Sequence, residues 1–158
     1  MGERTPGGEG IVKFICDEQL GRLAKWLRIQ GCDTVFQCPF PDDRLLRRAH
    51  DDKRTLLTRD RSLSSKTLWP VVFIKAVHFR EQIKELRLKV RMPKASLFSR
   101  CLRCNTLIRP LPRSKAQDKV PQEVFDSYKE FFICRDCRQI YWKGSHVKNT
   151  EARLLELG

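Results

Sequence analysis

Four of the seven cysteines lie in two C-x-x-C pairs, Cys101 with Cys104 and Cys134 with Cys137. Two such pairs, each in a turn, give a tetrahedral zinc ion its four sulfur ligands. Because sulfur would then fill every ligand position, this zinc would be structural rather than catalytic. A small module of about 50 residues also needs such support, since its own core is limited. The alternatives are a thiol redox pair or four cysteines without metal.

A second set of candidate metal ligands is acidic. Asp17 directly follows one β-rich segment, Asp42 comes shortly after a second, and Asp60 lies two residues after a third. In an open α/β sheet, ligands bind at the carboxyl ends of the strands, so these three acids could converge there. Two charges about 4 Å apart repel by roughly 4 kcal/mol at an effective dielectric of 20. A divalent cation such as Mg²⁺ or Mn²⁺ would offset that repulsion, and a bound proton is the rival explanation.

Such a metal ion could activate water and neutralise charge on a phosphodiester, and nearby basic side chains could bind phosphates. Three candidate phosphate-binding residues, Arg22, Lys25 and Arg28, are expected on the face of the first predicted helix opposite its apolar stripe. Two more, Arg59 and Arg61, flank Asp60. Each feature taken singly also has a structural explanation. Asp17 and Asp42 could cap helices, Asp60 could start a turn, and a basic helix face is usually just solvated.

The second cysteine pair is followed by aromatic and cationic side chains. Tyr141 and Trp142 precede Lys143 and His146, and rings beside cations can stack the bases of a nucleic acid. The alternative is that the two rings fill the core of the small zinc module. The three other cysteines, Cys16 among them, are given no metal-binding role, and Cys16 is expected to be a small core residue.

The elements that must position these side chains follow from the apolar patterning. Segments 11–16, 33–37, 54–58 and 71–75 read as strands. Helices are expected over Leu20 to Leu27, after Asp42 as a cap, and over Phe79 to Val90. Strands that alternate with helices predict a parallel sheet flanked by helices. We expect domains at 11–92 and 99–147, a linker near Pro93, a flexible tail at 1–10 and a Pro-rich loop at 109–119.

Composition limits the class of protein. The 158 residues carry a formal net charge of +13, and 41% are hydrophobic, so the chain can bury a core and is not disordered throughout. Basic residues in both parts suit a polyanion, with nucleic acid the usual candidate; a merely soluble basic protein is the alternative. The longest apolar run, Leu68 to Ile74, is far shorter than the roughly 20 residues that span a bilayer. We expect no membrane partner and an intracellular protein, cytoplasmic or nuclear.

Several strings together are similar to one known family. They are FICDEQLGRLAKWLR at 14–28, DDRLLRRA at 42–49, LLTRDRSL at 56–63, SRCLRCN at 99–105, CRDC at 134–137 and IYWKGSH at 140–146. The chain resembles the Mut-seven C-terminal RNase family over about residues 11–150. The resemblance implies an α/β fold with a PIN-like parallel sheet flanked by helices, followed by a small zinc ribbon.

The resemblance also implies metal-dependent RNase activity, with the acidic roles at Asp17, Asp42 and Asp60 and with Asp43 as a competitor for the second role. Many PIN domains have a fourth acid just after the third, where this chain has Arg61 and Ser62. The number of catalytic metal ions, one or two, therefore stays open. In some animal proteins the domain follows a DEDD-type exonuclease domain. The chain could therefore be part of a larger exonuclease polypeptide.

The sequence therefore predicts a ribonuclease that uses Mg²⁺ or Mn²⁺ to hydrolyse RNA, single-stranded RNA being the expected partner, with a ribbon that helps bind the strand. The alternative is a non-catalytic zinc-ribbon module that recruits RNA for a partner enzyme. A DNA nuclease is a third possibility, because phosphate and metal chemistry are shared by the two nucleic acids.

Overall fold

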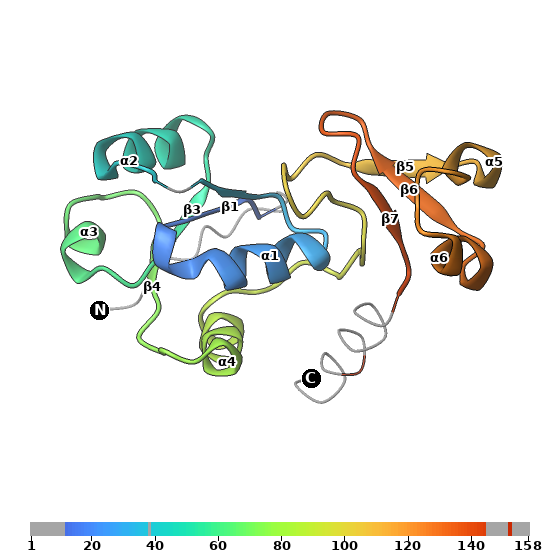
Figure 1. Ribbon diagram of the computed structural model, residues 1–158. Helices are drawn as coiled ribbons and strands as arrows, with labels where there is room; N and C mark the ends of the chain where they lie inside the picture. Colours follow the sequence, from blue (N-terminus) through green and yellow to red (C-terminus); the bar gives the residue numbers. More distant parts are fainter. Residues whose placement is uncertain (1–11, 38, 145–151, 153–158) are drawn as a thin grey trace. The chain divides into compact units, whose positions relative to one another are not determined.

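The computed structural model describes residues 12–37, 39–144 and 152. The chain divides into two units, Met1–Leu97 and Phe98–Gly158 (Figure 1). The predicted tail at 1–10 and the candidate residue His146 lie outside the described residues. None of the helices in the described part of the chain combines the length and the apolar character needed to cross a membrane.

The first unit is built on a four-stranded parallel sheet, as the alternating pattern predicted. In spatial order its strands are β2 (Thr34–Phe36), β1 (Phe14–Cys16), β3 (Thr55–Thr58) and β4 (Val71–Phe73). The chain therefore passes from β1 to β2 on one side and then to β3 on the other. In a sheet with such a reversal, a crevice opens outside the carboxyl ends of the two strands at the switch point, here β1 and β3.

Helices follow each of these strands in the chain. They are the 3₁₀ helix η1 (Glu18–Leu20), α1 (Gly21–Ile29), α2 (Asp42–Asp51), α3 (Arg61–Ser65) and α4 (Phe79–Lys89). The three predicted helices are confirmed as α1, α2 and α4. The sequence pattern did not predict η1 and α3, because each is too short to show an apolar period.

Residues that alternate along β1 and β3 supply the two faces of the sheet. Ile15 and Leu56 pack with Leu45 and Ala49 of α2 and with Leu63 of α3, and all five are at most 1% exposed. Each buried isoleucine or leucine of this group stabilises the fold by roughly 1.5–3 kcal/mol. The alternate residues Cys16 and Leu57 point to the opposite face, where α1 packs against β1 and β2 (Figure 1).

Gly21 begins α1 where the helix meets β2. A Cβ atom at this position would lie 2.9 Å from Cζ of Phe36, closer than real Cβ atoms come to other side chains. The missing side chain therefore lets the first turn of α1 pack directly on the Phe36 ring.

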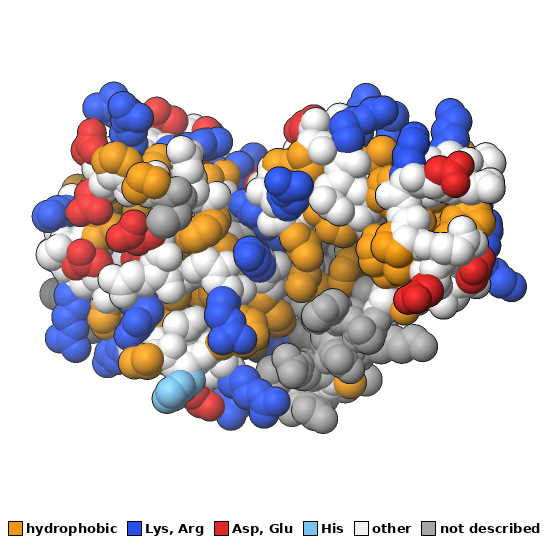
Figure 2. All heavy atoms as spheres, in the orientation of Figure 1, with side chains coloured by type: hydrophobic (Ala, Val, Ile, Leu, Met, Phe, Trp, Pro, Cys, Tyr) orange, Lys and Arg blue, Asp and Glu red, His pale blue; other side chains and the backbone are white. Residues whose placement is uncertain are grey.

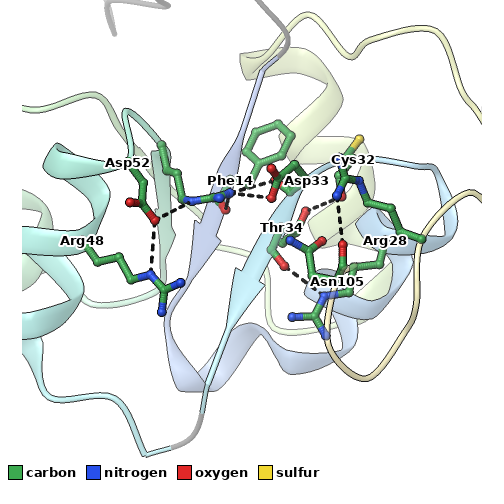
Figure 3. A network of polar contacts seen from close by, with 10 residues as sticks. Phe14, Arg28, Cys32, Asp33, Thr34, Arg48, Asp52 and Asn105 are labelled. Carbon is green, nitrogen blue, oxygen red and sulfur yellow. Dashed lines mark hydrogen bonds and ion pairs between the residues drawn. The ribbon is translucent and has the colours of Figure 1, made fainter. Parts of the chain in front are cut away.

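The amino ends of the strands are joined by Arg54, which is 8% exposed. Its Nη1 donates to Asp33 Oδ1 at 2.7 Å and to the Phe14 carbonyl at 3.3 Å, and its Nε donates to Asp52 Oδ2 at 3.2 Å (Figure 3). Burial of Asp52 opposes ionisation, but hydrogen bonds from Arg48 and Arg54 outweigh it and lower the pKa of the carboxyl. This network stabilises the amino ends of the strands, the end of the sheet opposite Asp17 and Asp60.

The second unit carries a three-stranded antiparallel sheet, in the order β5 (Ile108–Leu111), β6 (Phe131–Cys134) and β7 (Ile140–Trp142). Two short helices, α5 (Arg113–Ala116) and α6 (Gln122–Ser127), separate β5 from β6. The Phe125 ring of α6 stacks on Phe131 of β6, with centroids 6.0 Å apart. This contact covers one face of the small sheet.

The expectation that residues 109–119 form a loop is wrong, since they contain most of β5 and all of α5. Pro110 is tolerated in β5 because this strand lies at the edge of the sheet, where a missing N–H is least costly. Pro112 directly precedes α5 and Pro121 directly precedes α6. The prolines thus mark helix starts rather than the absence of structure.

Candidate functional site

Asp17 lies directly after β1 and is 7% exposed. The pairing of Cys16 with Leu57 brings it level with the end of β3. Its Oδ2 accepts hydrogen bonds from the Thr58 hydroxyl and from the Arg59 backbone N–H, the latter at 3.0 Å. Its Oδ1 accepts from the Gln19 N–H at 3.0 Å, which caps η1. The carboxylate is thus held by the strand on the other side of the switch point.

Asp60 is the N-cap of α3. Its Oδ1 accepts from the Ser62 N–H at 2.7 Å and from the Leu63 N–H at 3.4 Å. The Ser62 hydroxyl and the Ser62 N–H, both donating to the carboxylate, hold the pKa of Asp60 below its usual value. Asp60 thus follows the third strand, as predicted, and it also starts the next turn of the chain, as its structural explanation predicted.

Thr58 connects the two acids. Its buried hydroxyl accepts a hydrogen bond from the Asp60 backbone N–H at 2.9 Å and donates to Asp17 Oδ2. Sequence reasoning gave Thr58 no role. A threonine that ends a buried strand, two residues before a candidate acid, is a signal that could have identified it.

Asp42 and Asp43 occupy the first turn of α2 and are exposed. The expectation that Asp42 caps this helix is wrong, because Pro41 holds the N-cap position and Asp42 is the first helical residue. Negative charges in the first turn still stabilise the helix through its dipole. Both acids come after the carboxyl end of β2 in the chain. The start of α2 has no side-chain cap hydrogen bond, so capping does not account for either acid.

The structure does not gather all the acids at one point. Within residues 12–37, 39–144 and 152, the one group of three or more His, Cys, Asp or Glu side chains that could hold a single ion is the cysteine cluster. A metal ion shared by Asp17, Asp42 and Asp60 stays a prediction.

The predicted basic residues have different environments. Arg22 and Lys25 are exposed on α1, and the Arg22 guanidinium lies over the Phe79 ring, 4.8 Å from its centroid. Arg61 is exposed and lies over the Phe73 ring at 5.4 Å. Figure 2 shows Lys and Arg side chains distributed over the visible surface of both units, with Asp and Glu among them.

Arg28 does not lie on the exposed face of α1 with Arg22 and Lys25, and that expectation is wrong. It is 4% exposed, and its Nε donates to the Thr34 carbonyl at 2.9 Å (Figure 3). Arg28 comes four residues after the buried Ala24, and residues at this spacing share one helix face. Its guanidinium therefore joins α1 to β2.

Arg59 lies beside Asp17 and is half-buried. Its Nη1 donates to Gln19 Oε1 at 3.5 Å, whereas its Nε is buried and finds no acceptor among the described residues. A buried donor without an acceptor costs roughly 1–3 kcal/mol. Arg59 therefore carries an unsatisfied buried donor close to Asp17.

The four cysteines of the second unit converge as predicted. Cys101 and Cys134 are buried, Cys104 and Cys137 are exposed, and all four Sγ atoms lie within 4.8 Å of one another. Neighbouring Sγ atoms are 3.4–3.6 Å apart. A tetrahedral ion with Zn–S bonds of about 2.3 Å places its sulfurs about 3.8 Å apart. The cluster therefore fits a metal such as zinc.

The two C-x-x-C turns share one backbone geometry. Asn105 and Arg138, which directly follow Cys104 and Cys137, have positive φ angles of 67° and 62°. In the first turn the Cys101 N–H donates to the Thr106 carbonyl at 2.8 Å. The Thr106 hydroxyl donates to a carboxylate oxygen of Asp136 in the second turn. Backbone conformation and this contact place the two sulfur pairs face to face.

The thiols have unequal environments. Burial opposes ionisation of Cys101, but hydrogen bonds from the Tyr141 hydroxyl and from the N–H groups of Cys104 and Arg103 lower its pKa to about 6. Burial and the neighbouring sulfurs instead raise the pKa of Cys104 to about 12. The first unit's Cys16 is fully buried, and burial raises its pKa, as expected for a core residue.

Tyr141 and Trp142, the aromatic residues after the second C-x-x-C turn, contact other residues of the second unit. The Tyr141 hydroxyl lies 3.0 Å from Cys101 Sγ, and Trp142 pairs with the buried Phe131 across β6 and β7. Lys143 is exposed, with its Nζ 3.8 Å from a carboxylate oxygen of Glu130. These contacts favour the core-filling interpretation for the tyrosine.

Comparison with known proteins identifies the family. The family model of the Mut7-C RNAse domain matches residues 12–154 and so covers both units. Comparison with curated proteins gives no match, and comparison with solved structures gives none. On the family match, which spans most of the sequence and includes the sheet edge and all four clustered cysteines, the chain belongs to the Mut7-C RNAse domain family.

Proposed function

We propose that the protein is a metal-dependent ribonuclease whose active site lies at the carboxyl ends of β1 and β3. The family match points to a nuclease-like enzyme. The observation that carries the location is the hydrogen-bonded series of Asp17, Thr58 and Asp60 at the switch point of the sheet. The parallel sheet and these acids support a PIN-like nuclease domain.

Asp17 and Asp60 would hold Mg²⁺ or Mn²⁺, with Asp42 or Asp43 as a further ligand. Carboxylate oxygens are the ligands such hard ions prefer, and the ion, when bound, supplies water activation and charge neutralisation. Asp17 is fixed by the hydrogen bonds from β3 described above. This pre-organisation keeps one ligand in place before substrate binds.

Basic side chains around the acids would bind the phosphates of the substrate. The buried Nε of Arg59 needs an acceptor, and a phosphate oxygen beside Asp17 would provide one. Arg22 and Arg61 are exposed and lie over phenylalanine rings, which limits the freedom of each guanidinium. Lys25 adds a further exposed charge on α1.

The second unit would be a zinc ribbon. Zinc bound by the four cysteines would stabilise its fold, and Lys143 would assist RNA binding. Zinc would be structural, because sulfur occupies all four ligand positions. We propose single-stranded RNA as the substrate of an intracellular enzyme, cytoplasmic or nuclear, that could act within a larger exonuclease polypeptide.

A cleavage assay tests the enzyme. Labelled single-stranded RNA and DNA of one sequence are incubated with the protein and Mg²⁺ or Mn²⁺. We expect metal-dependent RNA cleavage that falls by at least about 100-fold in the double variant Asp17→Asn/Asp60→Asn, since transition-state charge stabilisation is lost. Asp51→Asn, an exposed acid at the end of α2, is the matched control. Full activity in the double variant would sink the proposed site.

Single variants distinguish the two adjacent acids of α2. Asp42→Asn and Asp43→Asn remove one exposed charge each from the same helix turn, so their effects on stability should match. The variant that loses more activity, with a raised requirement for Mn²⁺, identifies the ligand. Equal activity in both variants and the wild type would remove α2 from the site.

One observation favours a second function, a non-catalytic RNA-binding module. In the described ranges the acids are not gathered as the cysteines are. Such a module would bind RNA with an affinity that falls steeply with salt, because phosphate contacts release counterions. The wild-type protein would then show no cleavage with either metal, an outcome that excludes the enzyme.

A further inference from the structure

The Tyr141 hydroxyl joins β7 to the first cysteine turn. Its oxygen lies 3.0 Å from Cys101 Sγ and 3.2 Å from the backbone nitrogen of Leu102. Tyr141 and Cys101 come from different ends of the ribbon sequence, so this contact is a tertiary one. No role was predicted for the hydroxyl from the C-x-x-C spacing.

The direction of these hydrogen bonds is fixed by their chemistry. The Leu102 N–H can only donate, so it uses a lone pair of the Tyr141 oxygen. The hydroxyl proton is then available to point at Cys101 Sγ, and a sulfur bound to a metal as thiolate has no proton of its own to donate. With a metal bound to the thiolate, Tyr141 is therefore the donor and Cys101 the acceptor.

The four sulfurs differ in how well they are held. Cys101 is completely buried and accepts from three donors, the Tyr141 hydroxyl and the N–H groups of Arg103 and Cys104. Cys104 and Cys137 are exposed. Hydrogen bonds to a metal-bound thiolate disperse its negative charge, which matters in a four-thiolate site because Zn²⁺ neutralises only half of that charge.

We propose that Tyr141 is a positioning residue of the tetracysteine metal site, and that its hydroxyl makes Cys101 the firmly held ligand and leaves Cys104 and Cys137 as the reactive sulfurs. This inference rests on the proposed zinc binding but not on RNA cleavage. Outer hydrogen-bond partners of metal ligands change metal affinity by about 10–100-fold. Loss of the hydroxyl should change affinity within that range.

The experiment compares Tyr141→Phe with the wild-type full chain. Phenylalanine keeps the ring in β7 and removes only the oxygen. We expect zinc affinity, measured by competition with a chromophoric chelator, to fall by at least about 10-fold. Tyr128→Phe is the matched control, since the Tyr128 hydroxyl lies near Gly144 rather than at a cysteine, and this variant should bind zinc like the wild type.

A second readout separates positioning from simple structural support. In the Co²⁺-substituted protein, loss of a hydrogen bond to a ligating thiolate should shift the sulfur-to-cobalt charge-transfer band in Tyr141→Phe but not in Tyr128→Phe. Limited alkylation of the zinc-bound wild type should label Cys104 and Cys137 before Cys101. In Tyr141→Phe, the labelling of Cys101 should rise.

The outcomes are distinct. If the wild type binds zinc and Tyr141→Phe matches its affinity and cobalt spectrum, the inference is wrong, even if the variant melts at a lower temperature. If the wild type binds neither zinc nor Co²⁺, both the metal site and this inference fail. Neither result bears on RNA cleavage by the first unit.

Discussion

The two candidate sites of this protein place their ligands in opposite ways. In the ribbon, four sulfurs lie within 4.8 Å of one another. At the sheet edge, backbone N–H groups hold Asp17 and Asp60 separately, and the Thr58 hydroxyl connects the two. Protonated thiols can meet without charge repulsion, whereas ionised carboxylates repel strongly at short range.

The difference also reflects how each site is encoded. Each cysteine pair is set by one tight turn, and the spacing of three residues alone brings its two sulfurs together. The acids follow strands that are neighbours only because β1 pairs with β3 across the sheet. Each sulfur pair is therefore set by local geometry, although strand pairing brings the two pairs together, whereas the sheet site depends on tertiary packing alone.

The largest expected effect comes from the loss of one clustered cysteine in the second unit. Cys134→Ser removes a buried ligand at the end of β6. Since structural zinc contributes on the order of 10 kcal/mol in small modules, we expect loss of zinc and unfolding of the second unit. Zinc content and two-dimensional NMR of the full chain measure the result, and signals of the first unit should persist.

Cys32→Ser provides the control, because Cys32 is also buried but lies in the first unit. This variant should keep one zinc per chain. A folded second unit in Cys134→Ser, with or without zinc, would show that the ribbon is stabilised by its apolar core instead.

Much of this organisation could be predicted from the sequence. The cysteine spacing predicted the cluster of four sulfurs that could hold a metal, and the alternating apolar segments predicted the parallel sheet. The positions of Asp17 and Asp60 at strand ends were also predicted. What the strand order added is that β1 and β3 flank the switch point.

Other features depend on contacts that spacing does not encode. Arg28 is expected opposite the apolar stripe of the first helix, whereas packing of α1 on β2 buries it, and its Nε donates to the Thr34 carbonyl. The strand and helix within 109–119 were missed because prolines at an edge strand and before a helix resemble loop signals. The position of Thr58 at the end of a buried strand is visible in the sequence, but its two hydrogen-bond partners depend on the pairing of β1 with β3.

The next prediction measures the core of the first unit independently of metal. Leu56→Ala truncates a fully buried side chain in the cluster with Ile15 and Leu45. We expect the free energy of unfolding of this unit to fall by about 2–5 kcal/mol, with zinc content unchanged. Leu68→Ala, at a fully exposed leucine, should change it by less than about 0.5 kcal/mol. An equal loss in both variants would contradict the packing described here.

A smaller effect sharpens the link between the two acids. Thr58→Val keeps the shape of a buried side chain but leaves the Asp60 N–H without its acceptor and Asp17 without one donor. An unsatisfied buried group costs about 1–3 kcal/mol, so unfolding in denaturant should detect it. Thr58→Ser retains the hydroxyl and should recover most of the loss. If serine and valine variants are equally destabilised, the methyl group rather than the hydrogen bonds is what matters.

The smallest expected effect is the response of the Asp60 cap of α3 to low pH. The pKa of Asp60 is lowered by hydrogen bonds from Ser62, so its contribution to α3 is complete above the unfolded value of about 3.9 and is lost as pH falls through the lower folded value. The Ser62 amide shift should therefore titrate with a midpoint below 3.9, and Asp60→Asn should abolish that titration. A midpoint at or above 3.9 would mean that the cap does not favour the charged carboxylate.

Because the hydrogen bonds of Asp60 reach only the first turn of α3, protonation of this residue should leave the amide signals of α2 in place. Acid should thus loosen the Asp60 cap of α3 alone, whereas the loss of a single sulfur should unfold the second unit as a whole.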